Sequence, residues 1–137
     1  MKILVPVDSS EFAFKALEKA IEIAKQQGAE LTIMSVAAQF EGVAEEVPIS
    51  YADKLKNEAR KAVNRGKQLV EQAGLTCKTV VEVGASPADN IVRYAEESKT
   101  DLIMMGHRGM AGLARFVVGS VASRVVAHAP CSVQVVR

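Results

Sequence analysis

Four residues near the carboxyl end have the types and spacing needed to bind an anion such as a phosphate. Gly106 and Gly109 are separated by two residues, and nine further residues lead to Gly119 and Ser120. Glycines let backbone N–H groups approach an anion without a Cβ atom in the way. A helix that starts at Ser120 would add unpaired N–H donors and a partial positive charge. The Ser120 hydroxyl and the planar Arg108 guanidinium can supply further hydrogen bonds, so the spacing indicates an anion site.

The charge distribution is consistent with an anion site in this part of the chain. Residues 102–137 contain four arginines and no acidic residue, whereas residues 1–101 contain thirteen basic and sixteen acidic residues. A net charge of +1 gives no indication of a nucleic-acid partner. No apolar run approaches the length of a membrane span, and the amino terminus lacks the features of a signal peptide. We therefore expect a single cytoplasmic domain of 137 residues.

A second interpretation of the glycines is a long connection in which they only relieve backbone strain. The common phosphate loops G-x-x-x-x-G-K-[S/T] and G-x-G-x-x-G are both absent. The anion site is favoured because a strand-like run precedes Gly106 and a helix-like run follows Gly119.

The elements that would position this site alternate between strand and helix along the whole chain. Ser10 and Ser86 are placed to cap helices, Pro87 suits a first helical position, and Gly28 suits a helix end. Apolar runs predict strands over residues 2–7, 30–37, 76–83, 101–106 and 131–136, and helical spacing predicts helices over 10–27, about 50–73, 86–98 and 120–128.

This alternation predicts a doubly wound, open parallel sheet of five strands with helices on both faces. The strand order is left open between 2-1-3-4-5 and 3-2-1-4-5, because periodicity does not distinguish them. In both orders a ligand would bind beyond the carboxyl ends of the strands.

Histidine and cysteine give no metal motif. Cys77 and Cys131 have no ligand or redox spacing and are expected to be free, largely buried thiols. His128 is expected at the surface near a helix end, and His107 lies inside the glycine motif.

The glycine motif resembles the ATP-binding signature of the universal stress protein family, Gly-2x-Gly-9x-Gly-(Ser/Thr). The resemblance extends over the chain: ILVPVDSSEFAFKAL is similar to the family's first strand, aspartate and helix, and residues 81–137 are similar to its carboxyl-terminal half. One departure is Cys131-Ser132-Val133, where the family usually has Cys-Pro-Val; this position lies outside the nucleotide motif.

The resemblance implies a Rossmann-like domain over residues 1–137 with strand order 3-2-1-4-5. Asp8 and Gly106 would then face one crevice, and Asp8 would bond the ribose or a water on a phosphate-bound divalent ion. The implied nucleotide site consists of Pro6, Val7, Asp8 and Ser9 along the adenosine, Val36 near the adenine, Met105 and Gly106 as the floor, and His107, Arg108, Gly109, Gly119, Ser120 and Val121 around the phosphates.

The function implied is that of an ATP-binding switch or sensor in stress response, with slow or no hydrolysis. Efficient hydrolysis needs a positioned base, a metal and charge stabilisation, and this crevice offers Asp8 and Arg108. A weak ATPase or phosphotransferase is one alternative, and a nucleotide-independent interaction protein is another. We also expect Mg²⁺ or Mn²⁺ to be held through the phosphates, and a homodimer to form through the last strand, residues 131–136, with no nucleic-acid or membrane partner.

Overall fold

The computed structural model describes residues 1–39, 49–107 and 119–137 of the chain. The strands are β1 (Lys2–Pro6), β2 (Glu30–Ala38), β3 (Cys77–Gly84), β4 (Leu102–Gly106) and β5 (Ser132–Val136). The helices are α1 (Glu11–Gln27), α2 (Ile49–Gln72), α3 (Pro87–Glu97) and α4 (Ser120–His128). All neighbouring strands are parallel and follow the order β3-β2-β1-β4-β5. The fold class and the order 3-2-1-4-5 are therefore confirmed.

The capping residues act as the sequence predicts. The Ser10 side chain accepts a hydrogen bond from the Ala13 N–H at the start of α1, and Ser86 does the same for Asp89 at the start of α3. Gly28 ends α1 with a φ of 68°, a left-handed conformation that glycine adopts without steric cost. These local signals fix both ends of α1 and the start of α3.

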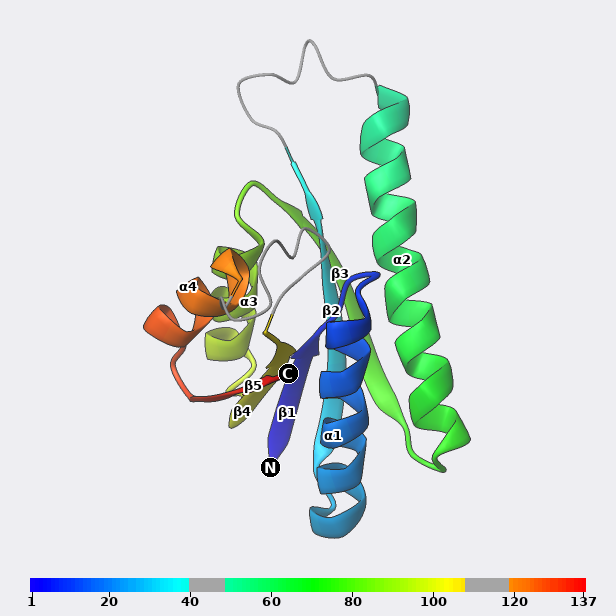
Figure 1. The fold of residues 1–137 in the computed structure, drawn as a ribbon, viewed down its shortest axis with the longest axis vertical. Coiled ribbons are helices and arrows are strands. Elements are labelled where there is room, and N and C mark those ends of the chain that lie inside the picture. Colours follow the sequence, from blue (N-terminus) through cyan, green and yellow to red (C-terminus); the bar gives the residue numbers. More distant parts are fainter. Residues whose placement is uncertain (40–48, 108–118) are drawn as a thin grey trace.

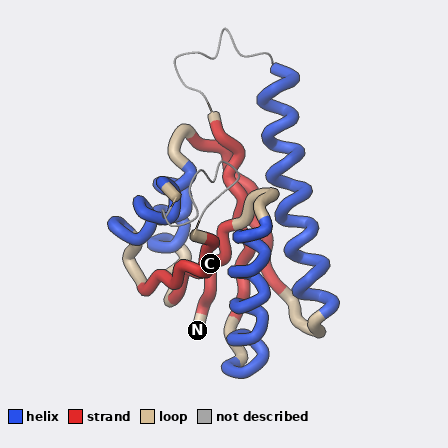
Figure 2. The backbone as a smooth tube through the Cα atoms, in the orientation of Figure 1, coloured by secondary structure: helices blue, strands red, loops and turns tan. Residues whose placement is uncertain are grey.

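The helices cover both faces of the sheet, as Figures 1 and 2 show. On one face α1 and α2 enclose a first core cluster that includes Val5, Leu17, Ile33 and Val63. On the other face α3 and α4 enclose a second cluster that includes Leu4, Met34, Ile91, Met105 and Val125. Successive residues of a strand point to opposite faces, so β1 contributes Val5 to the first cluster and Leu4 to the second.

Polar contacts attach α3 to its neighbours. The Glu82 carboxylate on β3 accepts hydrogen bonds from Asn90 (2.9 Å) and Arg93 of α3. Burial raises the pKa of the Glu82 carboxyl, but the hydrogen bonds from Arg93 and Asn90 outweigh burial, so the net pKa lies below the ordinary value. Asp89 of α3 pairs with Arg124 of α4 at 2.9 Å. These contacts link β3, α3 and α4 on one face of the sheet.

Other sequence expectations can be compared directly with the described residues. The thiols of Cys77 and Cys131 are free and half-buried, and burial raises the pKa of each. His128 ends α4 and is exposed, as expected. No helix in the described residues is long and apolar enough to span a membrane.

Candidate functional site at the carboxyl ends of β1 and β4

β1 and β4 are neighbours in the sheet, but they stop pairing with each other before either strand ends. The β1–β4 pairing includes Ile3–Leu102 and Leu4–Ile103, and among the described residues it goes no further. In contrast, β1 pairs with β2 as far as Pro6–Met34, and β4 pairs with β5 as far as Gly106–Val136. At their carboxyl ends β1 therefore pairs with β2 and β4 pairs with β5. The point where β1 and β4 no longer pair is the switch point, where doubly wound sheets bind ligands.

Pro6 gives a physical reason for this loss of pairing. The Val7 N–H donates to the Met34 carbonyl of β2 at 2.8 Å. Because N–H directions alternate along a strand, the backbone nitrogen of the preceding residue faces β4. Pro6 has no N–H, so the chain lacks a donor at the position where the β1–β4 ladder would continue.

The residues predicted to line the adenosine and the floor of the site divide between the two faces of the sheet. Val36 is half-buried and packs against the second core cluster, and Met105 is a buried member of that cluster. Pro6 follows the same alternation as Leu4 and belongs to this face, whereas Val7 is buried in the first cluster, beneath α1. The structure therefore brings Pro6, Val36 and Met105 to one face and directs the Val7 side chain away from it.

Asp8 and Ser9 form the turn between β1 and α1. Asp8 Oδ1 accepts a hydrogen bond from the Ser10 N–H at 2.8 Å. This contact is an Asx-type turn, which fixes the carboxylate beside the end of β1 and uses one of its two oxygens.

Gly106 ends β4 in close contact with the first turn of α1. A Cβ atom at Gly106 would lie 2.7 Å from the backbone carbon of Phe12 and 2.8 Å from its Cβ. Carbon atoms in contact are normally separated by about 3.5–4.0 Å, so only glycine fits here without a shift of α1. The need for glycine at this position has a steric cause on the α1 side of the sheet.

The His107 ring is buried at the end of β4, against the first turn of α1. The side chain is buried and packs edge-on against the Phe12 ring, with ring centroids 4.5 Å apart and an interplanar angle of 83°. Its backbone N–H donates to the Val136 carbonyl at 2.9 Å, and its carbonyl accepts from the Gly119 N–H at 2.6 Å. The backbone of His107 therefore bonds to the end of β5 and to the start of α4, while its ring packs against α1.

The start of α4 differs from the starts of α1 and α3. Gly119 is its N-cap, with φ −62° and ψ 158°, and no side-chain hydrogen bond caps the helix there. Ser120 and Val121 follow as exposed residues. The first N–H groups of a helix have no partner within the helix, so this end presents backbone donors next to the end of β4.

Two predicted site residues, Arg108 and Gly109, lie outside the described residues. Within the parts of the chain that the structure describes, no group of three or more His, Cys, Asp or Glu side chains is placed to hold a metal ion. Arg124 is exposed and forms the ion pair with Asp89.

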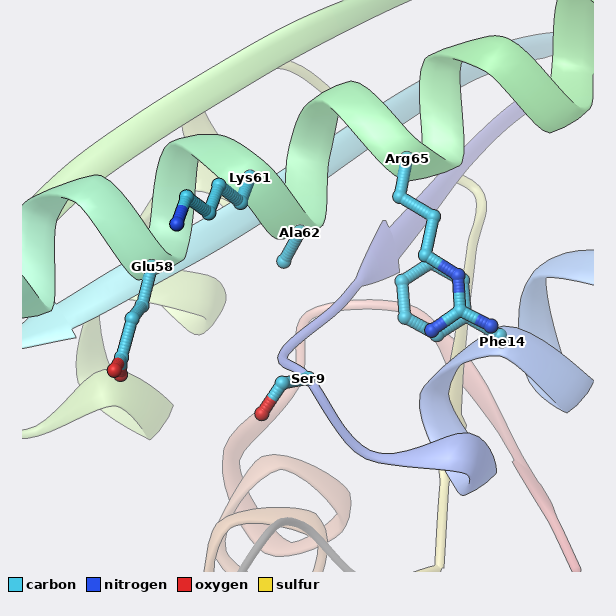
Figure 3. Close-up of a pocket in the computed structure, with 6 residues that line it drawn as sticks. All are labelled: Ser9, Phe14, Glu58, Lys61, Ala62 and Arg65. Carbon is cyan, nitrogen blue, oxygen red and sulfur yellow. The ribbon is translucent and has the colours of Figure 1, made fainter.

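A separate pocket of about 230 Å³ lies on the α1–α2 side of the molecule. Figure 3 shows its lining, in which the Arg65 guanidinium covers the Phe14 ring at 3.9 Å and Ser9 lies near Ala62. Ser9 is the one predicted nucleotide-site residue among those that line it. The pocket thus lies on the other side of the β1–α1 turn from the face that carries Val36 and Met105.

Sequence reasoning overlooked Phe12 as a site-related residue. Its spacing within α1 is that of an ordinary core position, so it carries no local signal of a role at the end of β4. The contact with Gly106 and His107 depends on how α1 crosses β4, which is a tertiary property.

Comparisons with known proteins identify the family of this chain. The sequence model of the universal stress protein family matches residues 1–137. A universal stress protein of Methanocaldococcus jannaschii is 38% identical over 139 aligned positions, which include 99% of this chain and 81% of that protein.

Two solved structures extend the comparison to the fold. The universal stress protein UspA from Lactobacillus plantarum is similar, with a TM-score of 0.87 and 35% identity, over 100% of this chain and 97% of that one. A universal stress protein in complex with cAMP is also similar, with a TM-score of 0.73 and 25% identity, over 100% of this chain and 97% of that one. The match of sequence and fold over the whole chain shows that it belongs to the universal stress protein family.

Proposed function

We propose that this protein binds ATP beyond the carboxyl ends of β1 and β4 and acts as a nucleotide-dependent switch or sensor in stress response. The observation that carries the proposal is the start of α4, where Gly119 supplies no side-chain cap. In α1 and α3 a serine hydroxyl bonds to the first turn, and such a cap contributes typically about 1 kcal/mol. An anion bound at α4 would satisfy donors that its N-cap leaves available.

The surrounding residues support a nucleotide rather than a simple anion. The β1–β4 ladder ends before the strands do, and the crevice beyond such a switch point is where doubly wound sheets bind nucleotides; here Pro6 and Met105 lie at that point. Asp8 lies beside this place with a second carboxylate oxygen that can accept from a ribose hydroxyl or from a water on Mg²⁺ or Mn²⁺. The family signature at Gly106, Gly109, Gly119 and Ser120, and the relative solved with cAMP, favour an adenine nucleotide.

We infer slow or no hydrolysis from the chemistry of the predicted site residues. Asp8 is the one carboxylate among them, and it also orders the β1–α1 turn through Ser10. A fast ATPase needs one group to orient the attacking water and others to hold the metal and stabilise the developing charge. A weak ATPase or phosphotransferase remains the alternative, and multiple-turnover release of phosphate would distinguish it. We place the protein in the cytoplasm as a homodimer.

The start of α4 provides a sharp test of ATP binding. Ser120→Glu adds a negative charge at the first position of the helix, where an acidic side chain stabilises the helix but repels phosphate. Ser120→Gln has nearly the same size without the charge. We expect calorimetry to show that the wild type binds ATP with about one site per chain, that the glutamate variant loses at least about tenfold in affinity, and that the glutamine variant loses much less.

The two variants also separate binding from folding. Thermal unfolding of Ser120→Glu should occur at or above the wild-type temperature, because its charge favours the helix start. Wild-type protein that does not bind ATP would contradict the proposal. A folded Ser120→Glu variant with wild-type affinity would show that the phosphates lie elsewhere.

A further inference from the structure

Phe12 contacts the end of β4 through both its backbone and its ring. Its backbone carbon occupies the space beside Gly106, within 2.7 Å of where a Cβ would lie, and its ring contacts the His107 imidazole. The Lys15 ammonium lies 5.7 Å from the centre of the same ring. The first turn of α1 is therefore packed directly against the residues where β4 leaves the sheet.

His107 connects the two ends of the glycine motif. Its carbonyl accepts the Gly119 N–H at 2.6 Å, and its N–H bonds to Val136 at the end of β5. The His107 carbonyl thus ties the end of β4 directly to the N-cap residue of α4. The ring of that residue is buried against Phe12.

We propose that Phe12 is a positioning residue for the phosphate end of the site. By fixing the His107 ring, Phe12 fixes the carbonyl that holds Gly119, and so the direction of the N–H groups at the start of α4. This inference rests on the proposed binding of ATP. It predicts a larger effect on the phosphates than on adenosine, whose expected contacts at Pro6, Val7, Asp8, Ser9 and Val36 lie on β1, the β1–α1 turn and β2.

Phe14 offers a matched control on the same helix. It lies two residues further along α1, is buried in the first core cluster, and packs against Arg65 of α2. Figure 3 shows that Phe14 lies on the α2 side of α1. Truncation of Phe14 removes an aromatic ring of the same size and destabilises the fold without loss of the contact to His107.

The test compares Phe12→Leu with Phe14→Leu. We measure the affinities for ATP and for adenosine by calorimetry, together with the midpoint of thermal unfolding. Phe12→Leu should reduce the ratio of ATP affinity to adenosine affinity by about tenfold. Phe14→Leu should lower the unfolding midpoint and leave that ratio unchanged, and Phe12→Tyr, which retains the ring, should restore the wild-type ratio.

The outcomes distinguish this inference from the proposed function. If the wild type does not bind ATP, the proposed function fails. If the wild type binds ATP and folded Phe12→Leu keeps the wild-type ratio, the positioning role is wrong. His107→Gln removes the other ring of the contact and must lower the ratio in the same direction. A folded His107→Gln variant with the wild-type ratio would therefore overturn the inference even if Phe12→Leu does not fold.

Discussion

At the scale of single residues, the glycines of the motif have different physical roles. Gly106 is required by the approach of α1, because Phe12 backbone atoms occupy the place of its Cβ. Gly119 has a φ and ψ that other residues can adopt, so its backbone conformation does not require glycine, and no side chain caps α4 there. Only the spacing of these glycines was visible in the sequence; the reason for each depends on its neighbours in space.

Gly106→Ala should destabilise the protein strongly. The added methyl group meets backbone atoms of α1, which can move only if the helix shifts, and overpacking of this kind typically costs about 1–3 kcal/mol. We expect a lower free energy of unfolding by urea denaturation. Gly84→Ala serves as the comparison, because its Cβ would meet the Asn90 side chain, which can rotate away at the cost of its hydrogen bond to Glu82, without a shift of backbone. Equal losses of unfolding free energy in the two variants would mean that α1 shifts at no greater cost than a side chain.

At the scale of elements, the sequence predicted the helices and strands closely but not their arrangement. Ser10, Gly28, Ser86 and Pro87 are local signals, and the helix ends follow them. The first strand ends at Pro6 rather than at the predicted residue 7, although the Val7 N–H still bonds to β2. Periodicity records which residues are apolar and says nothing of which strands are neighbours, so the order 3-2-1-4-5 came from the family resemblance.

The sequence predicted where the site residues lie along the chain, but it did not predict their contacts in space. Periodicity placed Asp8, Gly106 and Ser120 at strand ends and a helix start, because these positions depend on short segments. The inward direction of the His107 ring and the role of Phe12 were not predictable, because both arise where α1 crosses β4. The contribution of Pro6 depends on which neighbour its nitrogen faces, and that is known only once the strand order is known.

Pro6→Val should extend the β1–β4 ladder and weaken nucleotide binding. Valine supplies the missing N–H on the side that faces β4, and a typical intramolecular hydrogen bond contributes about 0.5–1.5 kcal/mol. We expect the new amide to be protected in hydrogen exchange and ATP affinity to fall. Stability should change little, because loss of the proline frees the unfolded chain by a similar amount, about 0.4–1 kcal/mol. Rapid exchange of the residue 6 amide would show that something other than the missing donor ends the ladder.

At the scale of the whole molecule, the two edges of the sheet differ. The β3 edge carries Lys78 and Glu82, charges of the kind that discourage pairing with another chain. The β5 edge, Ser132–Val136, has the sequence SVQVV and no charge or proline. Because Val136 directs its carbonyl to His107 of the neighbouring β4 connection, alternation directs the N–H and carbonyl of Val135 outward. This edge is therefore available to pair with a second copy of the chain across a two-fold axis.

Val135→Pro should convert a dimer into a monomer. The substitution removes the outward N–H and fixes φ, so two β5 strands lose a hydrogen bond that they would exchange. We expect light scattering to report a dimer for the wild type at micromolar concentration and a monomer for the variant. Val135→Thr retains the N–H and the branched side chain and should stay dimeric. A monomeric wild type, or a dimeric proline variant, would rule out this interface.

The two ends of the sheet also differ in the length of their connections. At the amino end the chain returns from helix to strand within two to four residues, as at Gly28–Ala29 between α1 and β2. At the carboxyl end two connections are longer, residues 39–48 between β2 and α2 and residues 107–119 between β4 and α4, whereas residues 7–10 and 85–86 are as short as the turns at the amino end. Doubling a flexible connection costs only about 0.6 kcal/mol of closure entropy. Descendants of one ancestral gene can therefore lengthen, shorten or rewrite the carboxyl-end segments and acquire new ligands, while the short turns at the other end keep the inherited scaffold unchanged.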